Sequence, residues 1–440
     1  MCIVVVLTGG CLRPDNLASI PDAGPVGEPA PRTYAGDMAE RPLHIAVVAL
    51  HTSPFAAPGS GDVGGMNVLV RATAERMASE GHSVEVITRR FTPDLPAVST
   101  RPSGVVLRLI DAGPAALRPK GEQEAFVAAF RVGLDDVDDV DVVHSHHWLA
   151  GMAGLPFARD RCVPHVQSFH SIAAHPSTQL AEGERPESPG RLTGEAQLAR
   201  ESDAVVAVSH AEQRTIVGRL RASPDRVHVV LPGVDATLFH RGSRRTEPRP
   251  YVVTAARIEP LKGLDLAIRT IAALPDARRP DLVIAGGPTD GYERHVDELR
   301  ALAAELDVTE RVRFAGPLTR EDLAELFAHA SAVLVPSHSE TYGLVALEAQ
   351  ASGIPVLASA SGGLVEAVNR QAVLLSSRDP REWAQRLGAL LDDRPLWEAQ
   401  SAAGIRFAAE RSWDRTAHET VRVYRELLGH ADHASWRNCA

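Results

Sequence analysis

The sequence predicts an α/β protein made of two consecutive domains, each built on a doubly wound parallel sheet. Three observations predict this class. The chain has 440 residues, about three times the roughly 150 that are typical of one domain. Its composition, 44% apolar and 23% charged, is that of a globular protein with sizeable cores. Short apolar runs also alternate with helical patterns in two successive series, as in parallel sheets covered by helices on both faces.

The first series occupies the first half of the chain. Apolar positions from Met66 to Met77 recur at the spacing of one helical face, which predicts a helix that ends at Gly81. The predicted strands are the short apolar runs at residues 44–50, 83–88, 105–110, 141–146, 165–169, 204–208 and 227–231. Helical stretches separate these strands, so the runs predict one parallel sheet.

The second series repeats this alternation. Its predicted strands are residues 251–256, 281–285, 312–315, 332–336 and 355–358. Its predicted helices are residues 264–274, 320–329, 344–351, 379–391 and 415–428. Two such sheets in tandem leave a cleft between the carboxyl ends of their strands, where ligands of open α/β sheets bind.

Changes in composition predict the domain boundaries. Residues 1–42 are rich in Pro, Gly and Ala without periodicity and predict a disordered leader, in which Met38 is an alternative start. We expect a first domain at 43–240 and a charged, proline-containing linker at 241–250. A second domain at 251–410, a C-terminal helix within 411–430 and a tail at 431–440 complete the chain.

Charge and cysteine content exclude several classes of function. The 46 basic and 56 acidic residues give a net charge of −10, which argues against a nucleic acid or an anionic membrane as partner. The four cysteines lie far apart and indicate neither a disulfide framework nor a zinc site. No apolar run approaches 18 residues and no basic segment opens the chain, so a cytoplasmic location is expected.

A glycine-rich loop joins the first predicted strand to the first helix. It reads Gly-Ser-Gly-Asp-Val-Gly-Gly-Met-Asn from Gly59 to Asn67. Glycines allow a ligand to approach the backbone closely, and a helix start offers N–H groups to an anion such as a diphosphate. The loop is not GxGxxG, so NAD binding is disfavoured.

Two cations follow the first strand of the second domain. Arg257 and Lys262 would lie at the carboxyl edge of that sheet, where an arginine fork and a lysine point charge suit two phosphates and the charge of a departing nucleoside diphosphate. Lys262 is one of only two lysines in the chain, the other being Lys120. Arginine fills almost every other cationic position, so a retained lysine favours a function that needs a compact charge.

Two carboxylates follow a later strand of the same domain. Glu340 lies in the loop after the strand at 332–336, and Glu348 lies two turns into the next helix. Carboxylates at this separation suit a ligand rich in hydroxyls, one holding sugar hydroxyls and the other a ribose.

No metal site is predicted. Strand alternation places His144 and His146 on one face and His147 on the other, which favours packing for the first two. Two Asp-Val-Asp motifs at 136–141 precede a strand instead of following one, which favours a solvated acidic loop.

The glycine loop, Arg257, Lys262 and the string PSHSETYGLVALEA at 336–349 together resemble the retaining glycosyltransferases of family 4. These enzymes have the GT-B fold, in which two Rossmann-like domains face each other across an active-site cleft. The resemblance spans about residues 43–428. It includes the stretches HTSP at 51–54, HSHHWL at 144–149 and GLVALEAQ at 343–350.

The resemblance implies roles for residues on both sides of the cleft. The implied donor-binding residues are Gly64, Gly65, Arg257, Lys262, Glu340 and Glu348. The implied catalytic residues are His170, Arg257, Lys262 and Glu340, with His170 beside the donor sugar. The implied acceptor-binding residues are His51, Asp62, Asn67, Lys120, His147, Ser171 and Arg191. The family also implies that the C-terminal helix crosses back to the first domain.

Five positions bear on the acceptor and the base. Lys120, Ser171 and Arg191 fall where relatives hold an acceptor phosphate. His147 and Ser171 replace a tyrosine and a threonine of the family at that site, and Leu318 replaces an arginine near the nucleotide base.

The resemblance implies transfer of a hexosyl unit to a polar cyclitol such as 1D-myo-inositol 3-phosphate. The preferred donor is UDP-N-acetylglucosamine, from which N-acetylglucosamine is transferred. The sequence indicates no required cofactor and no Mg²⁺, and it is compatible with a homodimer. One alternative is an antibiotic-pathway enzyme with another donor, for example a GDP-linked sugar, and an aminocyclitol or thiol acceptor. Two others are a noncatalytic sugar-nucleotide-binding protein and a GT-B-like epimerase, which has no need of a second anion site.

Overall fold

The structure is a computed structural model that describes residues 41–59, 61–118, 120–184, 188–242 and 249–429. The predicted tail, almost all of the predicted leader with Met38, and most of the predicted linker lie outside the described residues, as does the side chain of Lys120. The described residues from 42 onward form one compact unit, within which we distinguish two lobes, each with its own sheet.

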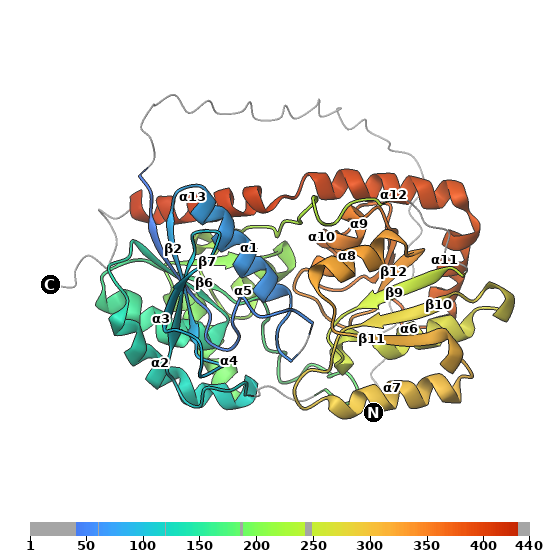
Figure 1. The fold of residues 1–440 in the computed structure, drawn as a ribbon, viewed down its shortest axis with the longest axis horizontal. Helices are drawn as coiled ribbons and strands as arrows, with labels where there is room; N and C mark the ends of the chain where they lie inside the picture. The colour runs from blue at the N-terminus through green and yellow to red at the C-terminus, as the bar shows by residue number, and fades with distance from the viewer. Residues whose placement is uncertain (1–40, 60, 119, 185–187, 243–248, 430–440) are drawn as a thin grey trace, which may run out of the picture. The chain divides into compact units, whose positions relative to one another are not determined.

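The first lobe contains an eight-stranded sheet in the order β3-β4-β2-β1-β5-β6-β7-β8 (Figure 1). Its strands are β1 (His44–Val48), β2 (Ser83–Arg89), β3 (Val98–Thr100), β4 (Val106–Ile110), β5 (Val142–His146), β6 (His165–Ser168), β7 (Ala204–Ala207) and β8 (Val227–Val229). The seven predicted strands are confirmed to within two residues at each end. β3 was not predicted, and it pairs antiparallel with β4 at the edge of an otherwise parallel sheet.

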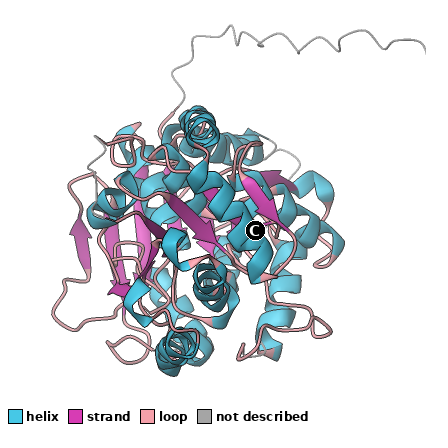
Figure 2. Ribbon diagram, turned by 90° about the vertical axis from the view of Figure 1, so that its right-hand side faces the viewer, coloured by secondary structure: helices cyan, strands magenta, loops and turns pink. Residues whose placement is uncertain are grey.

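Alternate residues of β1 face two different cores, which is the period-two pattern of a strand buried on both sides. Ile45 and Val47 belong to one apolar cluster together with residues of α1, whereas Ala46 and Val48 belong to another together with residues of α3. The helices of this lobe are α1 (Gly65–Ser79), α2 (Val127–Gly133), α3 (Trp148–Asp160), α4 (Pro189–Glu201) and α5 (His210–Gly218). Figure 2 shows helices around the strands in a second view.

The second lobe contains a six-stranded parallel sheet in the order β11-β10-β9-β12-β13-β14. Its strands are β9 (Tyr251–Ala255), β10 (Asp281–Ala285), β11 (Val312–Gly316), β12 (Ala332–Val335), β13 (Val356–Ser359) and β14 (Val373–Leu375). Its helices are α6 (Leu264–Ala273), α7 (Glu293–Glu305), α8 (Arg320–Ala328), α9 (Leu344–Ala351), α10 (Leu364–Ala367), α11 (Pro380–Asp392) and α12 (Arg394–Ala409). The five predicted strands are confirmed, and the predicted class of two parallel-sheet domains is confirmed with them.

Helix α12 was not predicted. The sequence does carry its start signal, because Asp393 accepts a hydrogen bond from the Leu396 backbone N–H at 2.9 Å and a proline occupies the first turn, a combination typical of helix N-termini.

The chain passes between the lobes twice, and the two passages touch. Val234 forms a parallel bridge with Ser412, and its backbone N–H donates to the Arg411 carbonyl at 3.0 Å. A Cβ on Gly233 would lie 2.3 Å from the Ser412 carbonyl carbon, so glycine is required for this close approach.

The last helix, α13 (Trp413–Gly429), follows the second passage and packs against α1 of the first lobe (Figure 1). Arg76 of α1 forms an ion pair of 3.0 Å with Asp414 of α13. The C-terminal helix therefore lies on the lobe to which the chain's first half belongs.

Candidate functional site

One cavity of about 1390 Å³ is lined by both lobes. Its wall includes Gly64, Gly65 and His170 from the first lobe and Lys262 and Glu340 from the second. The lining residues follow the carboxyl ends of β6, β9 and β12, where ligands of open α/β sheets bind.

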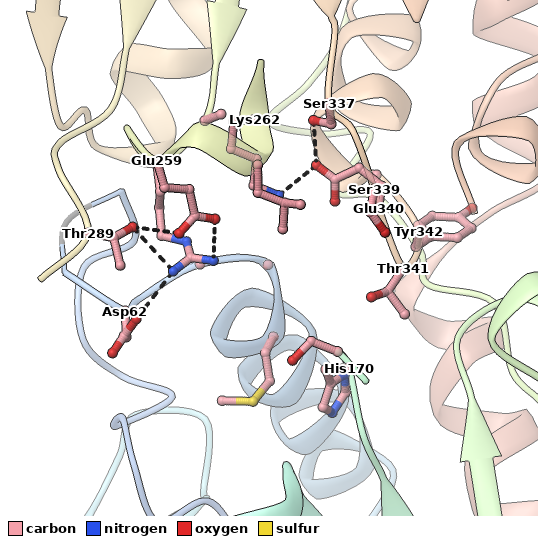
Figure 3. A pocket seen from close by; sticks show the side chains of 18 of the residues that line it. Asp62, His170, Glu259, Lys262, Thr289, Ser337, Ser339, Glu340, Thr341 and Tyr342 are labelled. Atoms are coloured by element: carbon pink, nitrogen blue, oxygen red, sulfur yellow. Dashed lines mark hydrogen bonds and ion pairs between the residues drawn. The ribbon is translucent and has the colours of Figure 1, made fainter. Parts of the chain in front are cut away.

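Lys262 and Glu340 form the centre of the second-lobe wall (Figure 3). The Lys262 Nζ lies 2.8 Å from the Glu340 Oε1, and the Ser337 hydroxyl donates to the same oxygen at 3.0 Å. Both charged side chains are largely buried, with 14% and 19% of their surface exposed. The carboxylate therefore holds the ammonium in the cavity, where a low dielectric strengthens its attraction for a phosphate.

Arg257 links the two lobes through a network of polar groups. Its guanidinium lies 3.3 Å from Asp62 Oδ1 of the first lobe and 3.1 Å from Glu259 Oε1. The Thr289 hydroxyl donates to the other oxygen of Glu259 at 2.9 Å. Asp62 thus lines the cavity and also contacts Arg257, a cation of the opposite lobe. Glu259 and Thr289 were not predicted, although Glu259 lies only two residues from Arg257.

The glycine loop approaches the second lobe at its backbone. The Gly287 backbone N–H donates to the Gly59 carbonyl at 2.7 Å. A Cβ on Gly64 would lie 3.5 Å from the Arg257 Nε, and one on Gly65 3.4 Å from the Leu344 Cδ1. The absence of side chains here lets the first turn of α1, with its unpaired N–H groups and positive dipole end, lie close to the second-lobe cations.

Asn67 holds this loop from behind the cavity wall. It is 1% exposed and does not belong to the cavity lining. Its side-chain amide donates to the Thr52 hydroxyl and the Ser53 carbonyl, both at 2.9 Å, and its oxygen accepts from the Gly64 backbone N–H at 3.1 Å. The structure thus places Asn67 where it fixes the start of α1 instead of on the lining.

Glu348 lies in the same cavity and is 2% exposed. Its Oε1 is 2.7 Å from the guanidinium of Arg320, at the start of α8. The other oxygen, Oε2, is buried without a hydrogen-bond partner among the described residues. Burial raises the pKa of Glu348, and the charge and hydrogen bond of Arg320 oppose the rise. Arg320 was not predicted, because it lies 28 residues from Glu348 with no local pattern to relate them.

His170 lies on the first-lobe side of the cavity, opposite Lys262 (Figure 3). Its backbone has a φ of 60°, and its Nε2 lies 2.8 Å from the Nδ1 of His146. Burial lowers the pKa of His170 to about 3. The ring is therefore uncharged at neutral pH.

A buried chain of polar groups continues from His146 toward α13. The rings of His144 and His146 lie 4.1 Å apart, on one face of β5 as predicted. The Ser168 hydroxyl donates to the Val206 carbonyl, so it accepts from the His144 Nε2–H at 2.9 Å. The Tyr424 hydroxyl then donates to the His144 Nδ1 at 2.6 Å, which ties α13 to β5.

Four of the predicted acceptor residues, His51, His147, Ser171 and Arg191, line the first-lobe side of the cavity. The Arg191 guanidinium donates to the Ser171 carbonyl and hydroxyl, both at 2.9 Å, and lies 2.7 Å from Glu195. The rings of His51 and His147 lie 4.1 Å apart in the lining. Lys120 begins a short 3-10 helix, Lys120–Phe126, but its side chain lies outside the described residues.

The comparisons with known proteins agree on a family. The family model described as Glycosyltransferase Family 4 matches residues 63–238, and the one described as Glycosyl transferases group 1 matches residues 235–407. The D-inositol 3-phosphate glycosyltransferase of Mycolicibacterium paratuberculosis is 40% identical over 92% of this chain and 96% of the relative. The enzyme of that name from Salinispora arenicola is 40% identical over 88% of this chain and 93% of the relative. The chain belongs to glycosyltransferase family 4.

Solved structures share the fold of this glycosyltransferase. Sucrose-phosphate synthase from Thermosynechococcus elongatus superposes with a TM-score of 0.78 at 25% identity, covering 88% of this chain and 99% of its own. Anabaena HepE in complex with UDP and glucose gives a TM-score of 0.69 at 18% identity, covering 87% and 100%. The predicted GT-B fold is confirmed.

Metal-ligand clusters and membrane-spanning helices are both absent from the part of the glycosyltransferase that the structure describes. No group of three or more His, Cys, Asp or Glu side chains there is placed to hold a metal ion. Among the described helices, none is both long and apolar enough to cross a membrane.

Proposed function

We propose that this family 4 enzyme transfers N-acetylglucosamine from its uridine diphosphate to 1D-myo-inositol 3-phosphate, with retention at the sugar. The observation that carries the donor half is the shared cavity, in which the start of α1 and the side chain of Lys262 line one space. A diphosphate placed there meets positive charge from both lobes. The acceptor half is supported by relatives with 40% identity whose name is D-inositol 3-phosphate glycosyltransferase.

In this proposal the second lobe stabilises the leaving group. Lys262 and Arg257 neutralise the charge that develops on the departing diphosphate, together with the Gly65 backbone N–H at the start of α1. Glu340 orients the hexose through its hydroxyls, and the buried Oε2 of Glu348 accepts from a ribose hydroxyl.

The acceptor hydroxyl needs a base, and the structure disfavours His170 for that role. A pKa of about 3 makes His170 a poor proton acceptor at neutral pH. Glu340 is engaged with Lys262 and Ser337. A departing phosphate oxygen that takes the proton on the same face of the sugar, as the family resemblance implies, fits these two facts. His170 then positions the donor sugar.

A specific observation favours a second class of acceptor. Glu122, Glu124, Glu182 and Glu184 are among the residues that line the first-lobe part of the cavity, as Arg191 is. Negative charge there suits an aminocyclitol, whose ammonium groups would pair with carboxylates. We therefore keep an aminocyclitol as the second candidate acceptor.

The test is a matrix of UDP-N-acetylglucosamine, UDP-glucose and a GDP-hexose against inositol 3-phosphate, free inositol, 2-deoxystreptamine and a small thiol, with products read by mass. The proposal expects the inositol 3-phosphate product from UDP-N-acetylglucosamine. A product only with 2-deoxystreptamine or the thiol would replace the acceptor. No transfer in any combination, with UDP still bound, would favour a noncatalytic sugar-nucleotide-binding protein.

Lys120→Ala sharpens the test of the acceptor phosphate. The KM for inositol 3-phosphate should rise about tenfold or more, because one charge-assisted contact is lost, and Lys120→Arg should restore much of it. An unchanged KM would contradict a phosphate site at Lys120. A cytoplasmic location and a homodimer remain predictions, which fractionation and sedimentation would test.

A further inference from the structure

A carboxylate from the second lobe binds the first turn of α5, which belongs to the first lobe. Glu366 of α10 accepts hydrogen bonds from the His210 backbone N–H at 2.9 Å and from the Ala211 backbone N–H at 2.8 Å. The His210 Nδ1 lies 2.8 Å from the same carboxylate. These contacts join residues that are about 155 positions apart in the chain.

The pairing is electrostatically favourable. A carboxylate at the start of a helix satisfies N–H groups that have no partner within the helix and meets the positive end of its dipole. Burial acts to raise the pKa of Glu366, but the hydrogen bonds from His210 and Ala211 outweigh it and the pKa is lowered. Glu366 therefore acts as an anion that bridges the two lobes.

The same turn of α5 also contacts the loop that carries Glu340. Ser209, which is fully buried, accepts from the Glu212 backbone N–H at 3.0 Å and so caps α5. Its hydroxyl donates across the lobes to the Thr341 carbonyl at 2.7 Å. Thr341 directly follows Glu340, so the cap of a first-lobe helix fixes the backbone beside a second-lobe donor residue.

On its other side, the turn is connected to His170. Glu212 is 4% exposed, and its Oε2 accepts from the Val208 backbone N–H at 2.7 Å. Burial raises the pKa of Glu212 to about 7, and the nearby backbone of His170 opposes this rise. The His170 backbone has a positive φ, a conformation that a non-glycine residue keeps only when its surroundings hold it.

We propose that Glu366 is a positioning residue for the transfer reaction. By binding the first turn of α5, Glu366 holds the two lobes in the relative orientation that brings Glu340 and His170 into one cavity. Glu366 itself does not line that cavity. The proposal rests on the proposed function only for its catalytic readout.

The test compares two histidine–glutamate pairs with the same nitrogen–oxygen distance of 2.8 Å. Glu366→Gln removes the bridging charge, and Glu298→Gln removes the charge from the pair with His295, also 2.8 Å long but contained within α7. Small-angle X-ray scattering of each protein with saturating UDP measures closure without an acceptor. Steady-state kinetics with the best donor and acceptor pair measure kcat.

Glu366→Gln should give a larger radius of gyration than the parent with UDP and a kcat lower by about tenfold, the size expected when hydrogen bonds to a charged group are lost at a partly exposed site. Glu298→Gln should match the parent in both. His210→Ala, which removes one of the three contacts at a 60% exposed side chain, should give a smaller shift of the same sign.

Parental scattering and parental kcat in Glu366→Gln would overturn the proposal, and so would equal effects in the control. If Glu366→Gln does not fold, parental values in His210→Ala overturn it equally. A parent that closes on UDP but transfers to no acceptor would contradict the proposed function and leave the closure result standing.

Discussion

The two sides of the cavity are built from different chemistry. On the second-lobe side, each cation is held by a carboxylate of the same lobe, as in Lys262 with Glu340 and Arg320 with Glu348. The first-lobe side combines imidazoles with carboxylates that no cation in the described part of the chain is shown to orient, among them Glu122 and Glu182. Burial lowers the pKa of His170 to about 3, and Arg191 with Glu195 is an ion pair there. The second lobe thus provides cations that are oriented before a ligand binds, whereas the first lobe provides uncharged imidazoles beside several carboxylates.

This difference teaches how a glycosyltransferase can divide its work. Charge that develops on a leaving diphosphate needs fixed cations near it. Substitutions on the two sides should therefore have different effects.

The largest expected effect is that of Lys262→Ala. Loss of a charge-stabilising contact in the transition state should lower kcat by roughly 10²–10³-fold, with every acceptor that the enzyme accepts. Steady-state kinetics measure this. Arg278→Ala removes an exposed second-lobe cation paired with Asp392 at 2.8 Å and should leave kcat unchanged. Near-parental kcat in Lys262→Ala would refute the role of the lysine.

A smaller effect is expected for Glu348→Gln. The substitution keeps the shape but removes the charge that a ribose hydroxyl would contact, so the UDP dissociation constant should rise about tenfold, with a smaller change in kcat. Titration calorimetry with UDP, 2′-deoxy-UDP and 3′-deoxy-UDP measures it. The effect should shrink with at least one deoxy ligand. An equal loss with all three, or none, would contradict ribose binding by Glu348.

The sequence was sufficient to predict which residues form the second-lobe side of the cavity, but not which residues they contact. Glu340 and Glu348 stand in one continuous string and Arg257 and Lys262 in another, so each pair was visible locally. The ion pair of Arg257 with Asp62 joins residues 195 positions apart. Such a contact depends on how the lobes pack, which no local spacing records.

The first-lobe side was harder because its residues come from many separate loops. His51, His147 and His170 each follow a different strand, and Arg191 lies in α4. Only the family resemblance related these residues before the structure did. Glu212 and Tyr424 were not singled out, because a buried glutamate at a helix start resembles a capping box and a tyrosine on an amphipathic helix resembles ordinary packing. Elements with strong periodicity, such as α6 and α11, were predicted well.

A change in pH tests whether the buried imidazoles of the first lobe are uncharged. Burial lowers the pKa of His165 from its ordinary value of 6.5 to about 3. Between these values the unfolded chain binds a proton that the folded protein does not, so the free energy of unfolding falls as the pH falls through this window. His165 contributes a slope of about 1.4 kcal/mol per pH unit.

His165→Gln should therefore reduce the pH slope of the unfolding free energy by about that amount between about pH 4 and 6, measured by urea denaturation. Ile216→Val, at a fully buried site, should lower stability by about 1 kcal/mol without changing the slope. A slope in His165→Gln equal to that of the parent would show that the buried imidazole is charged in the folded protein.

The most direct test of the two-lobed site is a crystal structure of the enzyme with UDP. We expect the diphosphate to lie between the lobes, with oxygens within about 3 Å of the Lys262 Nζ or the Arg257 guanidinium on one side and of the Gly65 backbone N–H on the other. A diphosphate held by one lobe alone, or bound outside the cavity that Lys262 and Gly65 share, would contradict the assignment.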